Sequence, residues 1–215
     1  MTTPVVVALA VAGLAAAVDW IAVARGDGVL ERIAKPAVMV GLLAAVLLAG
    51  PGTAPVRWLL VLALAASLAG DWLLIPPGRF VAGLVAFLVA HVAYLAIFLL
   101  GRLEVGGALA GLMLAGVLLL TAGRTILAGA RRARLAAPVA AYFAAICAMA
   151  IAATASGSVP AVAGAWLFVA SDTLLGWVRF VDRRADESPA PRVAVIVPYH
   201  LRQGLLAIAI LGIGA

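Results

Sequence analysis

The hydrophobic residues of this 215-residue chain fall into eight long runs, separated by short stretches that contain polar residues, glycine or proline. A helix that crosses a bilayer needs about 20 predominantly apolar residues, and each run approaches or meets that length. The pattern therefore predicts an all-α fold, a polytopic membrane helix bundle of about eight transmembrane helices with short connections. The predicted spans are residues 4–24, 34–50, 56–75, 80–100, 104–123, 135–155, 160–180 and 193–213.

Turn-forming residues mark the breaks between these runs. No polar stretch is long enough to fold alone, so residues 1–215 are predicted to form a single transmembrane domain. The first run lacks a basic region before it, which favours a retained helix over a signal peptide. Lys35-Pro36 is expected at the first turn of the second span, where proline is favoured. The predicted breaks are Arg25-Gly26-Asp27-Gly28, Gly50-Pro51-Gly52, Pro76-Pro77-Gly78, Gly101-Arg102, Arg131-Arg132-Ala133-Arg134, Ser156-Gly157-Ser158 and the polar loop from Asp182 to Arg192.

Composition supports the membrane assignment, because 67% of the residues are hydrophobic and only 11% are charged. A soluble domain needs far more charge on its surface. The net charge of +6 does not indicate nucleic-acid binding, since the basic residues lie between apolar runs rather than on one polar face. The single cysteine, Cys147, lies in an apolar run and is predicted to be a small packing residue, without a disulfide framework or thiol–metal motif.

The basic residues also predict an orientation, because loops on the cytoplasmic side are enriched in lysine and arginine. Twelve of them follow the odd-numbered spans, and only Arg57 and Arg102 follow the even-numbered ones. The sequence thus predicts a cell-membrane protein with both termini outside. The twelve are Arg25, Arg32, Lys35, Arg79, Arg124, Arg131, Arg132, Arg134, Arg179, Arg183, Arg184 and Arg192.

Two aspartates inside the apolar runs are the strongest functional candidates, since a charge in hydrocarbon is costly and usually marks a site. In the predicted topology, Asp71 lies about 7 Å and Asp172 about 10 Å from the cytoplasmic ends of their spans, at 1.5 Å per residue. Tyr199 and His200 lie at a similar depth, with Arg202 and Gln203 one turn further in. Two carboxylates at one depth favour a shared site in which one acts as an acid and the other as a base.

Structural roles remain open for several of these polar residues. Asp71 is also compatible with a purely structural interhelical pair to a basic residue such as Lys35 or Arg202. His91 and the nearby Tyr94 are as compatible with packing as with chemistry. Asp19 is expected to cap a helix end or reach the interface. Tryptophans near span ends fit interfacial belts; these are Trp20, Trp58 and Trp177.

A metal centre is disfavoured by the small number of suitable ligands. Zinc hydrolases use about three histidine or mixed histidine and carboxylate ligands. The chain has two histidines, His91 and His200, and no HExxH motif. We therefore expect neither a metal nor a cofactor.

Ordered motifs across nearly the whole chain resemble the YhhN family of eight-helix membrane proteins, whose characterised members are lysoplasmalogenases. Arg202 departs from the family pattern, in which a small residue is more usual at the position before Gln203. The matching pieces are Lys35-Pro36; Ser67-Leu68-Ala69-Gly70-Asp71; Phe80-x-x-Gly83-x-x-x-Phe87-x-x-x-His91-x-x-Tyr94; Tyr142 and Met149; Gly164-Ala165-x-x-Phe168-x-x-Ser171-Asp172; and Tyr199-x-x-x-Gln203.

The resemblance implies hydrolysis of the alkenyl ether of a lysophospholipid taken from the membrane, with Asp71 and Asp172 as catalytic residues near the cytoplasmic leaflet. It also implies substrate positioning by Lys35, His91, Tyr94, Ser171, Tyr199, Arg202 and Gln203, with Lys35 or Arg202 on the phosphate. Two other functions fit paired intramembrane aspartates: a small proton-coupled transporter and a non-catalytic lipid-binding protein. The transporter is disfavoured because no inverted repeat is visible.

Overall fold

The computed structural model describes residues 2–49, 53–75, 78–182 and 189–213, and within these ranges the chain is helical without strands. Eight of its helical spans are long and apolar enough to cross a membrane, which confirms the predicted polytopic bundle. The helices are α1 (Thr3–Arg25), α2 (Gly28–Ala49), α3 (Ala54–Leu74), α4 (Phe80–Leu99), α5 (Val105–Leu118), α6 (Arg124–Arg132), α7 (Ala136–Ala155), α8 (Val159–Phe180) and α9 (Pro189–Ile213), and a π-helical turn, η1 (Leu119–Gly123), joins α5 to α6.

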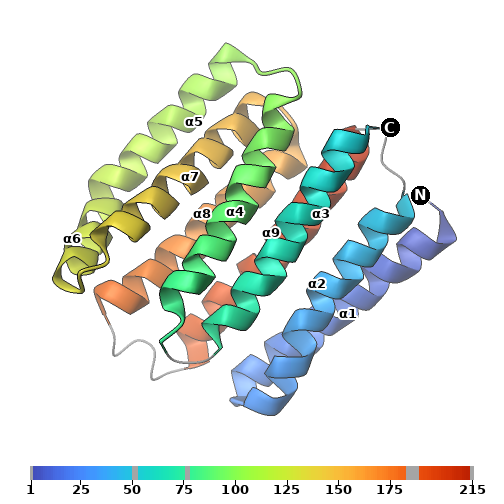
Figure 1. Ribbon diagram of the computed structural model, residues 1–215, viewed down its shortest axis with the longest axis horizontal. Coiled ribbons are helices and arrows are strands. Elements are labelled where there is room, and N and C mark those ends of the chain that lie inside the picture. Colours follow the sequence, from blue (N-terminus) through green and yellow to red (C-terminus); the bar gives the residue numbers. More distant parts are fainter. Residues whose placement is uncertain (1, 50–52, 76–77, 183–188, 214–215) are drawn as a thin grey trace.

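Helices that are consecutive in the chain form three tightly packed pairs, α1 with α2, α3 with α4, and α8 with α9. Helix α7 packs against α4, α5 and α8, while α9 contacts α1, α2, α3 and α8. In Figure 1 the α1–α2 pair lies at one edge of the bundle and α5 lies at the other. Because α9 contacts helices from both the first and the last part of the chain, the polar residues along it are placed at the centre of the protein.

The start of α2 differs from the sequence prediction. The helix begins at Gly28, six residues before the predicted start, since Asp27 Oδ1 accepts the backbone N–H groups of Val29 and Leu30 at 3.1 Å. This is N-terminal capping by a carboxylate. Pro36 consequently lies in the helix interior rather than in the first turn.

The fifth span is also longer than predicted. It continues through η1 and α6 to Arg132, a 28-residue segment, so most of the expected arginine-rich loop is helical. In η1 the hydroxyl of Thr121 donates to the carbonyl of Val117 at 2.7 Å. A π-helical turn inserts one extra residue per turn and often occurs beside a functional site.

Several predicted breaks are confirmed by left-handed glycines, with φ of 70° at Gly26, 87° at Gly78 and 69° at Gly157. Pro76, Pro77 and the Gly50-Pro51-Gly52 break lie outside the described residues, as do residues 183–188 of the predicted polar loop. The last four residues of that loop, 189–192, belong to α9.

Close packing of α5 depends on two glycines. A Cβ on Gly107 would lie 2.6 Å from the carbonyl oxygen of Thr154, and one on Gly111 would lie 2.9 Å from Cα of Ile151. Both contacts are to α7. Small residues four apart on α5 thus bring two backbones together.

Candidate active site

A cavity of about 150 Å³ lies within the bundle and has a mainly apolar wall. Every helix from α2 to α9 contributes to its lining, beginning with Lys35 on α2 and ending with Arg202 on α9. Polar side chains line part of its surface. They are Lys35, Asp71, Tyr142, Ser171, Asp172, Thr173, Arg179, Tyr199 and Arg202.

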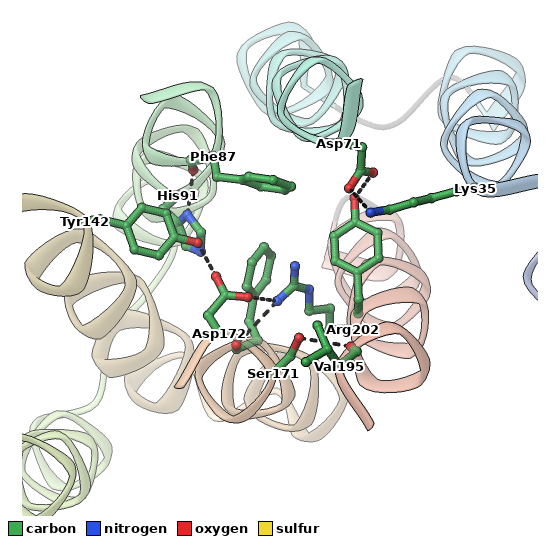
Figure 2. Close-up of polar contacts among 11 residues, drawn as sticks. Lys35, Asp71, Phe87, His91, Tyr142, Ser171, Asp172, Val195 and Arg202 are labelled. Carbon is green, nitrogen blue, oxygen red and sulfur yellow. Dashed lines mark hydrogen bonds and ion pairs between the residues drawn. The ribbon is translucent and has the colours of Figure 1, made fainter. Parts of the chain in front are cut away.

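Asp71, near the end of α3, is 2% exposed and has two partners in the cavity. Its Oδ1 lies 3.0 Å from the ammonium Nζ of Lys35, and its Oδ2 accepts a hydrogen bond from the hydroxyl of Tyr199. Figure 2 shows the side chains of Lys35 and Asp71 meeting from two helices. A buried carboxylate needs such a cation and such a donor, because burying a charge without partners costs several kcal/mol.

Asp172, on α8, has a matching pair of partners. Its Oδ1 lies 2.6 Å from Nη1 of Arg202, and its Oδ2 accepts a hydrogen bond from the hydroxyl of Tyr142. The carboxylate thus has one cationic and one phenolic donor, as Asp71 does. The two aspartates share one cavity, although they belong to separate ion pairs.

Arg202 organises the centre of this arrangement. The side chain is only 1% exposed, and its guanidinium lies over the rings of Phe168 and Tyr199, 3.2 and 4.3 Å from their centroids. It also donates to the carbonyl of Phe168 at 3.3 Å. In Figure 2 the guanidinium lies between Asp71 and Asp172. Repulsion between the carboxylates, expected from the sequence, is therefore offset by a cation at each of them.

Three predicted substrate-binding residues lie behind the cavity wall rather than on it. Tyr94 donates to Gln203 Oε1 at 2.7 Å, and both side chains are fully buried. His91 donates through Nδ1 to the carbonyl of Phe87, and its ring packs edge-on against Phe168, with centroids 4.3 Å apart. These residues are placed to fix the cavity wall.

Ser171 lines the cavity, but its hydroxyl donates to the backbone carbonyl of Val195 at 3.1 Å. This bond ties α8 to α9 immediately beside Asp172. This bond therefore helps to hold Asp172, the next residue on α8, at a fixed position relative to α9.

Three polar residues of the cavity were not among the sequence-predicted site residues, namely Tyr142, Thr173 and Arg179. Tyr142 stood out only as a matching motif residue, although a tyrosine in an alanine-rich run is itself a signal. Arg179 was counted with the loop charges, yet it lines the cavity with its guanidinium over the ring of Phe80, 4.7 Å from the centroid. No carboxylate partner of Arg179 is found in the part of the chain that the structure describes.

Asp19 does not cap a helix end as expected. It is fully buried against α9, with Oδ2 3.9 Å from Nε2 of His200. Trp20, expected in an interfacial belt, instead donates its indole N–H to Nδ1 of His200 at 3.1 Å. The position of α9 at the centre of the bundle explains both differences, because it brings His200 to the inner face of α1.

Within the described ranges, no three histidine, cysteine, aspartate or glutamate side chains are close enough together to hold a metal ion. The cavity instead combines carboxylates, phenols and cations, a set suited to proton transfer and to binding an anion.

Comparison with known proteins identifies one family. The YhhN family profile matches residues 30–210, a range that includes all nine polar residues of the cavity and excludes Asp19 and Trp20. No curated protein and no solved structure matches the chain.

Proposed function

Because the chain belongs to the YhhN family, we propose that it hydrolyses the vinyl ether bond of lysoplasmalogen-type lysophospholipids. The products are a fatty aldehyde and a glycerophospho-headgroup. The proposal rests on the resemblance described above and on one observation, namely two carboxylates that line the same apolar cavity, Asp71 buried and Asp172 12% exposed, each with its own cation and phenol.

The first step requires an acid, for which we assign Asp71. Its proton goes to the vinyl carbon remote from the ether oxygen, and the electrons of the double bond form the new C–H bond. An oxygen lone pair then completes an oxocarbenium ion, the kind of cation that carboxylates stabilise in glycosidases. Lys35 favours this assignment because an ammonium group can give up a proton and a guanidinium group does not.

The second step requires a carboxylate that stays ionised, for which we assign Asp172. Arg202 at 2.6 Å remains charged and keeps its partner in the anionic form. Asp172 takes a proton from water as the water oxygen bonds to the cationic carbon. The hemiacetal hydroxyl then gives its proton to Asp71 as the bond to the glycerol oxygen breaks. That oxygen takes the proton held by Asp172, so both carboxyl groups return to their starting states.

The phosphate is assigned to Arg179 rather than to Lys35 or Arg202, since those two cations are paired with the aspartates. Arg179 lies seven residues after Asp172 on α8, about 10 Å along the same face at 1.5 Å per residue. This separation allows a glycerol unit to join the phosphate to the ether bond.

The test is aldehyde release by the purified protein from an alkenyl lysolipid, with alkyl and acyl lysolipids for comparison. Asp71→Asn and Asp172→Asn should each reduce release by about 100-fold or more, the order expected for loss of an acid or base group. Asp27→Asn is the matched control, because asparagine caps a helix as well as aspartate does. In D₂O the aldehyde should carry one deuterium beside its carbonyl carbon.

The proposal fails if the unaltered protein releases no aldehyde from any of several alkenyl lysolipids, or if both aspartate variants stay active. Proton-coupled flux in liposomes without aldehyde release would favour transport instead. Thermal unfolding of each variant establishes that a loss of activity is not a loss of fold.

A further inference from the structure

The cavity is too small for a whole lysophospholipid. Its volume of about 150 Å³ is below the roughly 300–1,000 Å³ of pockets that hold drug-sized ligands. Only the reacting part of the substrate and the attacking water fit inside. The hydrocarbon chain must therefore leave the cavity through one of its walls.

An open groove adjoins the cavity between α5 and α8. Leu118, Val169 and Thr173 line both the cavity and the groove, so the two are continuous through these residues. The other groove residues are Leu114, Val117, Thr121, Trp166, Ala170, Leu174 and Trp177.

The groove exists because α5 packs mainly against α7 and leaves its side toward α8 open. Contacts to α8 are made further along the same span, by η1 and α6. The span formed by α5, η1 and α6 is also the least buried of the eight, at 11% against 33–50% for the others. Its position at the edge of the bundle is visible in Figure 1.

Two polar side chains of the groove wall, Thr121 and Trp166, have hydrogen-bond partners within the protein. Thr121 donates its hydroxyl to Val117, and the indole N–H of Trp166 donates to the hydroxyl of Thr154 at 2.9 Å. What remains facing the groove is mainly hydrocarbon and aromatic surface. Such a surface matches an alkyl chain and offers little to a polar ligand.

The length of the groove matches one leaflet. Trp166 and Trp177 lie eleven residues apart on α8, about 16 Å at 1.5 Å per residue. The hydrocarbon core of a bilayer is about 30 Å thick, so this is close to the depth that one lipid chain occupies.

We propose that the groove between α5 and α8 binds the hydrocarbon chain of the lysolipid while its ether bond lies in the cavity. The inference takes its ligand class from the proposed function. The phosphate lies near Arg179, the ether bond lies beside Asp172, and the chain runs along α8 toward Trp166. Since bilayer hydrocarbon is as apolar as the groove, the groove orients the chain more than it attracts it.

The test uses a single-chain alkyl ether lysophospholipid with a photoactivatable diazirine near the end of its chain. This probe lacks the vinyl double bond, so its binding can be measured whether or not the protein cleaves alkenyl ethers. After irradiation in lipid nanodiscs, labelled peptides are mapped by mass spectrometry. Labelling should concentrate on α5 and α8 around Leu114 and Trp166.

Blocking the groove provides the matched comparison. Ala170 is exposed in the groove, and Ala170→Trp should reduce labelling at Leu114 and Trp166 about tenfold, because a closed groove leaves the chain no path from the cavity. Ala65, exposed on α3 outside the groove and the cavity, is the control, and Ala65→Trp should leave the labelling unchanged.

Competition identifies the occupant. Excess unlabelled alkyl lysolipid should suppress the groove labelling, and excess diacyl phospholipid should not. Equal suppression by diacyl phospholipid would assign the groove to ordinary bilayer lipid and overturn the inference. Labelling spread evenly over lipid-facing helices, or crosslinks to a second copy of the chain at the groove, would also overturn it.

The two proposals fail separately. Groove labelling without aldehyde release from alkenyl lysolipids would support the chain site and remove the hydrolase. Aldehyde release with no groove labelling would support the hydrolase and remove the chain site.

Discussion

Arg202 donates to Asp172 across 2.6 Å in a part of the protein where the arginine is 1% exposed. The arginine stands at a position where the family resemblance leads us to expect a small residue. Its guanidinium fills the space between the rings of Phe168 and Tyr199. A residue that departs from the family pattern is thus the direct partner of a proposed catalytic carboxylate.

Loss of this ion pair should be costly. Arg202→Gln leaves Asp172 without its cation, and breaking a buried pair costs about 3–5 kcal/mol. Thermal unfolding in detergent should show this as a large decrease in melting temperature. Arg102→Gln, at an exposed arginine between α4 and α5, should change stability by less than about 0.5 kcal/mol. Equal effects of the two substitutions would contradict the buried ion pair.

The two phenols that donate to the aspartates should matter for turnover. Tyr142→Phe and Tyr199→Phe each keep the ring and remove the donor to Asp172 or Asp71. We expect each to lower the rate of aldehyde release by about 10–100-fold, as for loss of a partner that orients a reacting group.

Tyr94→Phe is the comparison for these variants, since its hydroxyl donates to Gln203 behind the cavity wall. It should reduce turnover far less and cost about 1 kcal/mol of stability, the usual net value of a hydrogen bond. Similar losses of turnover in all three variants would show that the hydroxyls act through packing.

Close approach of α5 and α7 gives a stability prediction with an adjacent control. Gly107→Leu places a side chain where a Cβ alone would meet Thr154 O at 2.6 Å, and overpacking of this kind costs about 1–3 kcal/mol. A Cβ on Gly106 would meet nothing within 4 Å, so Gly106→Leu should have little effect. Thermal unfolding of both variants measures the difference, and an equal loss of stability in the two variants would contradict the close packing of α5 on α7 as its cause.

The predicted orientation can be checked with single cysteines. Replacing the one native cysteine by Cys147→Ser leaves a background free of thiols. In intact cells, a membrane-impermeant maleimide should then label Arg102→Cys and not Arg131→Cys, because basic loops stay in the cytoplasm. Labelling of Arg131→Cys alone would reverse the orientation and put Arg179 toward the outer leaflet.

The order of residues was enough to specify the bundle, since eight runs of nearly 20 apolar residues have few alternatives to crossing a membrane. It also identified Asp71 and Asp172, because a carboxylate in an apolar run is costly and therefore conspicuous.

How the polar residues pair could be known only from the packed helices. The sequence was compatible with several pairings of these groups. The structure has Asp71 with Lys35 and Asp172 with Arg202. The choice depends on how α9 packs among α2, α3 and α8. The burial of Asp19 beside His200, near the opposite end of the chain, has the same origin. Helical periodicity fixes which residues share one face of a helix, whereas the partner of that face depends on contacts between helices that are distant in the chain.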